Sequence, residues 1–132
     1  MARIRMVVLY RFANQFNGIV VGTGNKSEIS VGYFTKYGDG GTDVLPIGDL
    51  YKTEIYEVAQ LLGLPERIIN KKPSADLWDG QTDEGEMGIT YRDLDAVLKG
   101  EITNGSAYEK VQEMRRKSEH KRSMPPIFKV QN

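Results

Sequence analysis

The stretch that decides the fold is GTGNKSEISVGYFTKYGDGGTD, residues 22–43. The apolar run IVV at 19–21 precedes it and predicts a buried strand. Two glycines then flank Thr23 in a tight turn, and a short helix is expected to begin near Asn25. A strand followed by a turn and a helix is a common ligand site in α/β proteins. A second polar loop, 37–43, adds three glycines and two carboxylates. Packing alone does not require this combination, so a binding site is predicted here.

The composition sets limits on function. The chain has 132 residues, enough for one domain, and a formal net charge of +0, which gives no general reason to expect a nucleic-acid or membrane partner. It has no cysteine, which excludes disulfides and thiolate metal sites. No apolar run approaches the roughly 20 residues of a membrane span. The opening MARIRM is not followed by the apolar region of a signal peptide, so we expect a cytoplasmic location.

Hydrophobic spacing predicts two helices around this stretch. In 2–16, apolar residues recur every fourth position and form one stripe, and Gly18 is expected to supply the left-handed conformation that ends the helix. In 50–62, the apolar residues are spaced for one buried face, with Asp49 as N-cap. Between them, the helix that begins after Asn25 has Glu28 three residues later, as in a capping box.

The C-terminal half is less regular. Residues 74–88 show little periodicity and predict a functional or mobile loop. Thr90 is expected to cap a helix over 91–99, and Ser106 to open a surface helix that ends near Lys117. The segment 19–21 is the one convincing strand, with 43–45 a weaker second. A lone strand cannot satisfy its own backbone groups, so its partners are expected elsewhere.

Two interpretations are open for Thr23 and Glu28. In a nucleotide site, the Thr23 hydroxyl would bond a base or phosphate and Glu28 would hold Mg²⁺, which needs only one or two protein carboxylates. Alternatively, Glu28 only closes the capping box. The loop 38–43 lacks the Lys-Ser/Thr end of a phosphate-binding P-loop and the closing Glu of an EF-hand. It presents Asp39 and Asp43 either to a ribose or amide, or to solvent.

Single basic residues are weaker evidence for a binding site than the motifs above. The candidate partners for phosphate or carboxylate groups are Arg3, Lys36, Lys52, Lys71 and Lys72. Lys52 is expected in the first turn of its helix, where a cation opposes the helix dipole, which hints at a nearby anion. The sole histidine, His120, has no metal-ligating partner in its segment, and the basic run near the C-terminus has no interleaved aromatics.

Six motifs together resemble the NAD synthetases. They are GTGNKSE (22–28), GYFTKYGDGGTD (32–43), PIGDLYK (46–52), PSADLW (73–78), QTDE (81–84) and EHKR (119–122). They occur in the family's order and with close to its spacing, and the resemblance covers nearly the whole chain, from Arg3 to Pro126.

This resemblance implies a homodimeric α/β enzyme of the ATP-pyrophosphatase type, an adenine nucleotide alpha hydrolase-like, Rossmann-like fold. The reaction it implies uses ATP and Mg²⁺. The carboxylate of deamido-NAD attacks the α-phosphate of ATP, and an acyl adenylate and pyrophosphate form. Ammonia, free or derived from glutamine, then displaces AMP and gives NAD.

The resemblance also implies roles for single residues. Thr23, Lys52 and Ser74 correspond to ATP contacts, and Glu28 corresponds to the Mg²⁺ ligand. The residues that correspond to deamido-NAD contacts are Arg3, Lys36, Asp43, His120 and Lys121. No residue is assigned as catalytic. The segment 74–88 resembles a loop that orders over the substrates.

The family's pyrophosphate loop, a Ser-Gly-Gly-x-Asp-Ser turn, is absent from these residues. We therefore expect residues 1–132 to be the C-terminal portion of a single synthetase domain, mostly helical with one or two parallel strands, and inactive by itself. Two alternatives remain at this point. One is a non-catalytic module that dimerises with a complete synthetase. The other is a different ATP-pyrophosphatase amide ligase, such as a GMP or asparagine synthetase.

Overall fold

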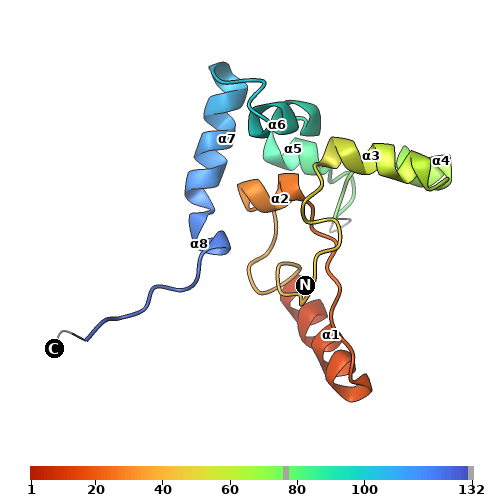
Figure 1. The fold of residues 1–132 in the computed structure, drawn as a ribbon, viewed down its shortest axis with the longest axis vertical. Helices are drawn as coiled ribbons and strands as arrows, with labels where there is room; N and C mark the ends of the chain where they lie inside the picture. The colour runs from red at the N-terminus through yellow and green to blue at the C-terminus, as the bar shows by residue number, and fades with distance from the viewer. Residues whose placement is uncertain (76–77, 131–132) are drawn as a thin grey trace.

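A computed structural model describes residues 1–75 and 78–130 of the chain. Within these residues there are eight helices (Figure 1). In chain order they are α1 (Ala2–Phe16), α2 (Lys26–Val31), α3 (Lys52–Leu61), α4 (Glu66–Ile69), α5 (Asp83–Met87), α6 (Tyr91–Leu98), α7 (Gly105–Lys117) and α8 (Glu119–Arg122). Helices α2, α5, α6 and α7 gather at one end, whereas α1 projects from the other and the C-terminal tail runs away from both.

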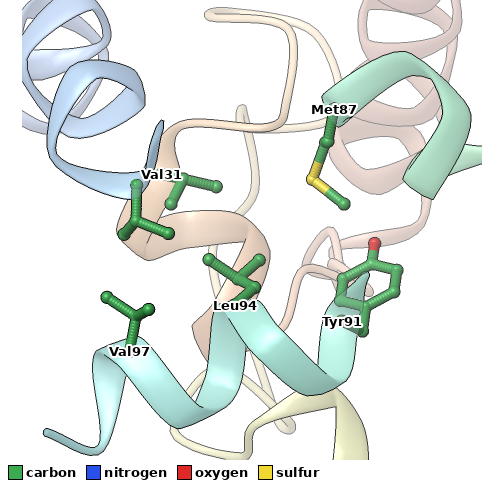
Figure 2. Close-up of a cluster of buried hydrophobic side chains, with 6 residues drawn as sticks. Val31, Met87, Tyr91, Leu94 and Val97 are labelled. Carbon is green, nitrogen blue, oxygen red and sulfur yellow. The ribbon is translucent and has the colours of Figure 1, made fainter. Parts of the chain in front are cut away.

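The hydrophobic core lies between α2, α5, α6 and α7. Its buried residues are Val31, Met87, Tyr91, Leu94, Val97 and Val111, and Figure 2 shows the first five of them facing one another. Helix α6 supplies three of the six because its apolar residues recur every third position, which places them on one face. Leu94 and Val111 are 0% exposed. The prediction that α7 lies on the surface is therefore wrong for Val111, which anchors α7 in this core.

The local capping signals are confirmed at two helices. The Asn25 side chain accepts a hydrogen bond from the Glu28 amide at 3.0 Å, and Glu28 Oε2 accepts one from the Asn25 amide at 3.2 Å, which completes the capping box of α2. The Thr90 hydroxyl accepts a bond from the Asp93 amide at 3.1 Å and begins α6 as expected.

Other helix ends differ from the sequence-based expectation. Asn17, at φ 50°, takes the left-handed conformation after α1 in place of Gly18. Helix α3 begins at Lys52, and Asp49 does not cap it, because its carboxylate pairs with Lys26 Nζ at 2.8 Å. Helix α7 follows Asn104 and already includes Ser106. Two short helices also lie where none was predicted, α5 within 74–88 and α8 in the tail.

The apolar faces of α1 and α3 are not buried. Neither helix contains a buried residue. Phe16 in α1 is 70% exposed and Leu61 in α3 is 87% exposed. The predicted buried face of α3 is therefore wrong at Val58, Leu61 and Leu62, which are exposed, whereas Leu50 and Ile55 are half-buried.

The predicted strand at 19–21 is reduced to a single contact. Val21 forms an isolated parallel bridge with Val44, supported by bonds from the Gly22 amide to the Val44 carbonyl (2.8 Å) and from the Asp43 amide to the Val20 carbonyl (2.9 Å). A longer strand would need a neighbour on its other edge. The prediction of parallel strands stays a prediction beyond this bridge.

Candidate functional site

An open cleft of about 920 Å³ lies between the α1 end and the α2–α3 end of the structure. Five of the residues to which the family resemblance gives a role line it, namely Thr23, Glu28, Lys52, Ser74 and Lys121, and so do the candidates Asp39, Lys71 and Lys72. The first five come from five separate segments of the chain. The fold therefore brings together the whole predicted ATP and magnesium set, with one residue of the predicted deamido-NAD set.

The tight turn before α2 depends on Gly22. A Cβ atom at this position would lie 2.6 Å from Thr42 Cγ2 and 2.7 Å from Leu45 Cδ2. Only glycine allows the 42–45 segment to approach so closely. This approach holds the Val21–Val44 bridge and leaves Thr23 exposed at the cleft wall.

Glu28 is held from three sides. Its Oε2 closes the capping box, while its Oε1 accepts a hydrogen bond from the Tyr91 hydroxyl at 3.1 Å and lies 3.7 Å from Lys52 Nζ. The Lys52 ammonium also lies 5.0 Å from the centre of the Tyr91 ring, which is cation–π distance. The capping and ligand interpretations of Glu28 are therefore compatible, because a carboxylate offers about four acceptor positions.

A tyrosine–carboxylate network continues from Glu28 along the cleft. The Tyr91 hydroxyl lies 3.1 Å from Asp83 Oδ2, and the Tyr33 hydroxyl lies 3.3 Å from Asp83 Oδ1 and 2.9 Å from Glu86 Oε2. Sequence reasoning gave none of these four residues a role. Their spacing shows no common pattern, and Tyr91 fits the apolar face of α6, so the main available signal was the acidic motif at 81–84.

Burial shapes the acidity of these two tyrosines. It is the main cause that raises the pKa of Tyr91 above its ordinary value, and the nearby charges of Glu28 and Asp83 raise that pKa further. The pKa of Tyr33 is raised by burial first and then by its hydrogen bond to Glu86. Both phenols therefore remain protonated donors toward the carboxylates at neutral pH.

The remaining predicted deamido-NAD contacts form a second group outside the cleft lining. Arg3 Nε donates to the Lys36 carbonyl at 3.2 Å, and Lys36 Nζ donates to the His120 carbonyl. These contacts join α1, the 33–41 loop and α8. Lys121 sits beside them and donates to the carbonyls of Gly32 (2.8 Å) and Phe34 (2.7 Å), so it anchors the C-terminal segment to the end of α2.

Asp43 ties the turn to α1. Its Oδ1 accepts a hydrogen bond from the Tyr10 hydroxyl at 3.0 Å, and its Oδ2 accepts one from the Val20 amide at 2.7 Å. Asp39 closes its own loop, because its carboxylate accepts a bond from the Thr35 amide at 3.0 Å. Both side chains therefore shape the loops in this structure. Within the PSADLW motif, residues 76 and 77 lie outside the described residues.

The predicted Mg²⁺ site depends on which side chains of the described residues could act as ligands. Within residues 1–75 and 78–130, no three His, Cys, Asp or Glu side chains are arranged to hold a metal ion. Magnesium bound with a nucleotide usually takes one or two protein carboxylates and completes its shell with phosphate oxygens and water. Glu28, one of the carboxylates that line the cleft beside Asp39, Asp83 and Glu86, fits that limited role.

Known proteins resemble this chain over most of its length. The family model for NAD synthase matches residues 1–125. The chain belongs to the NAD synthase family. It is 59% identical over 134 residues to the NH(3)-dependent NAD(+) synthetase of Archaeoglobus fulgidus, and 56% identical over 129 residues to that of Thermoplasma volcanium. These alignments cover 98% and 94% of the chain, but 54% and 53% of the relatives. The chain thus spans about half the length of these NAD synthase relatives.

Solved structures of the family superpose on most of the chain. The NMN synthetase of Francisella tularensis matches with a TM-score of 0.92 and 44% identity, over 98% of this chain and 54% of that protein. The NH3-dependent NAD synthetase of Campylobacter jejuni matches with a TM-score of 0.74 and 34% identity, over 97% and 52%. Across the described part of this NAD synthase chain, none of the helices has both the length and the apolar character needed to cross a bilayer.

Proposed function

We propose that residues 1–132 are the C-terminal portion of a single ammonia-dependent NAD synthetase domain. The complete domain would convert deamido-NAD to NAD with ATP and ammonia through an acyl adenylate. The observation that carries the proposal is the single cleft lined by Thr23, Glu28, Lys52 and Ser74. These residues come from four segments, and the fold brings them together in a chain that belongs to the NAD synthase family.

In this proposal the cleft is the ATP side of the reaction. The exposed Thr23 hydroxyl and the Ser74 hydroxyl bind the nucleotide, and the Lys52 ammonium neutralises charge that develops on the phosphates. A carboxylate is inert toward an amine until one of its oxygens becomes part of a good leaving group, which is what adenylation achieves. Glu28 would hold Mg²⁺, which would supply further neutralisation of phosphate charge.

The deamido-NAD side is proposed to lie at Arg3, Lys36, Asp43, His120 and Lys121. The 33–41 loop carries Lys36, and Arg3 and the exposed residue His120 contact Lys36, which suits an anionic dinucleotide. Lys121 differs from the others, since two of its three donors already serve backbone carbonyls. We therefore propose that Lys121 contributes to this side mainly by fixing the loop.

The rest of the domain is proposed to supply what this chain does not show. That includes the pyrophosphate turn and the neighbouring strands of a parallel ATP-pyrophosphatase sheet next to the Val21–Val44 bridge. Without them we expect the isolated chain to be inactive. The uncovered apolar residues of α1 suit a second copy in a homodimer. We also propose a cytoplasmic location, where ATP is abundant.

A chimeric enzyme tests the function directly. The part of the Archaeoglobus fulgidus relative that this chain does not match would be fused to residues 1–132. NAD formation from deamido-NAD, ATP, Mg²⁺ and ammonia would then be measured by chromatography. We expect turnover by the chimera and none by either part alone. Glu28→Gln should reduce kcat/KM by about 100-fold or more, because a metal-ligating charge is lost.

The matched control is Glu57→Gln, an exposed glutamate on α3 that does not line the cleft. It should leave the activity of the chimera within about twofold, the range of a surface change without contacts. Turnover by the isolated chain would contradict the inactivity proposed for it. A folded chimera that binds neither ATP nor deamido-NAD would contradict the proposed function.

A second candidate function differs in the substrate that is amidated. The structure with a TM-score of 0.92 is that of an NMN synthetase, and this observation favours a mononucleotide substrate as the second candidate. The chimera would be supplied in parallel with deamido-NAD and with the corresponding acid mononucleotide. A higher kcat/KM for the dinucleotide supports our proposal, and a higher value for the mononucleotide would replace it with the second candidate.

A further inference from the structure

The first turn of α3 is held by buried side chains from two other helices. Ser27 in α2 is 0% exposed and Asp95 in α6 is 2% exposed, and the Ser27 hydroxyl donates a hydrogen bond to Asp95 Oδ1. Ser27 Oγ in turn accepts a bond from the Lys52 amide at 2.9 Å, and Asp95 Oδ2 accepts one from the Thr53 amide at 2.9 Å. The pair therefore serves the amides of the first two residues of α3.

This arrangement replaces a local cap. The first amides of a helix have no partner within the helix and normally take one from a nearby Ser, Thr, Asp or Asn. The residue before α3 is Tyr51, which cannot do this for the Lys52 and Thr53 amides, and Glu54 satisfies only the Tyr51 amide, at 2.9 Å. The buried Asp95 carboxylate also places negative charge at the positive end of the helix, which offsets the unfavourable Lys52 cation there.

The same two helices also hold the Lys52 side chain. Glu28 follows Ser27 in α2 and lies 3.7 Å from Lys52 Nζ, while Tyr91 lies one turn before Asp95 in α6 and places its ring 5.0 Å from that atom. The backbone amide and the ammonium of Lys52 are thus both held by residues of α2 and α6 that lie close together in those helices. Its side chain remains only 19% exposed, at the wall of the cleft.

We propose that Ser27 and Asp95 are positioning residues that fix the start of α3 and thereby aim the Lys52 ammonium into the cleft. The role of that ammonium toward a nucleotide phosphate rests on the proposed function. The placement of the Lys52 side chain is independent of the proposed function, and it can be measured without any nucleotide.

Competitive amine acylation followed by mass spectrometry measures this placement in the 132-residue chain. The rate at Lys52 is divided by the rate at Lys117, which lies on α7 and pairs with Glu113. We expect the ratio to rise about fivefold in Ser27→Ala and Asp95→Ala, since the loss of an ion-pair and ring contact is worth about this factor. Asp95→Asn keeps an oxygen acceptor for the Thr53 amide and should largely restore the low ratio.

The control is Asp93→Ala, two residues away on the same helix. It removes the bond between the Thr90 hydroxyl and Asp93 at the start of α6 without touching α3, so the Lys52 ratio should stay at the wild-type value. If Asp95→Ala unfolds the chain, the ratio rises for that reason alone, because Lys52 is 19% exposed and Lys117 already 68% exposed. Only variants whose circular dichroism matches that of wild type are therefore compared, and the milder Ser27→Ala decides the test. An unchanged ratio in a folded Ser27→Ala chain would overturn the proposal.

A nucleotide measurement separates this inference from the proposed function. Binding of a fluorescent ATP analogue to the chimera described above is compared for wild type and Ser27→Ala. A changed acylation ratio without any nucleotide binding to wild type supports the positioning role and counts against the proposed function. Normal nucleotide binding by both proteins, with an unchanged ratio, supports the proposed function and overturns the positioning role.

Discussion

The two ends of the molecule use their apolar residues differently. At the α2–α5–α6–α7 end, Leu94 and Val111 are fully buried in a shared core (Figure 2). At the other end, α1 carries comparable apolar side chains that face outward, such as Phe16, and so does the part of α3 that leads away from the core toward α4, at Leu61. The sequence patterns of the two ends are similar, so the difference lies in whether a neighbour is present. The comparison shows that the first end buries its apolar side chains within the described residues, whereas those of α1 and of the far part of α3 stay exposed there.

Truncating a core residue gives the sharpest test of this difference. Leu94→Ala should lower the free energy of unfolding by about 3–5 kcal/mol, because a fully buried side chain leaves a cavity. Leu61→Ala, at an exposed position, should change it by less than about 0.5 kcal/mol. Urea titrations followed by circular dichroism would measure both. Similar losses for the two variants would show that α3 is buried in solution.

The next test compares two glycines with nearly the same backbone conformation. Gly32 has φ +67° and Gly63 has φ +66°. A Cβ at Gly32 would lie 2.6 Å from Ser118 Oγ and closer still to Ser118 Cβ, whereas nothing lies within 4 Å at Gly63. Gly32→Ala should therefore cost about 2–4 kcal/mol, from strain and overpacking together, and Gly63→Ala about 1 kcal/mol, from strain alone.

Thermal unfolding of the two variants would check this expectation, with wild type scanned beside them. Equal losses would mean that the start of α8 does not press on the end of α2. The expected inequality would instead show that the C-terminal segment is packed against the core end.

Alkaline pH should weaken the core end. The pKa values of Tyr33 and Tyr91 are raised in the folded chain, so the folded state keeps these protons after the unfolded state has lost them. Their contribution is complete below the unfolded tyrosine pKa of about 10 and is lost as the pH rises above it. Urea midpoints measured between pH 8 and 11 should fall above pH 10, by less in Tyr91→Phe than in wild type. Tyr37→Phe, at an exposed loop position, should follow wild type.

The smallest expected change in folding stability concerns α1. Phe12 is 51% exposed and stacks on Phe16 with ring centres 6.2 Å apart. Phe12→Lys should alter the free energy of unfolding by less than about 0.5 kcal/mol, since the side chain is not packed in a core. It should nevertheless reduce self-association measured by light scattering, because it places a charge within an exposed apolar surface. Gln15→Lys adds the same charge to a polar position of α1 and should leave self-association unchanged.

Local features of the fold could be predicted from the sequence because their partners are close in the chain. The capping box of Asn25 and Glu28 and the cap at Thr90 involve residues three apart, and both are confirmed. By contrast, the start of α3 was misplaced, because its first amides are satisfied by Ser27 and Asp95, which are distant in sequence.

The sequence by itself determined the family and the main helices, because motif order and helical periodicity are written in short stretches; which side chains bind a nucleotide stays a prediction from those motifs. Only the tertiary structure decided that Tyr91 joins Glu28 to Asp83, that Lys52 is aimed by two other helices, and that Arg3, Lys36 and His120 form a separate group. Those contacts link segments far apart in the chain, and a hydrogen bond or ion pair depends on atomic distances that residue spacing does not fix.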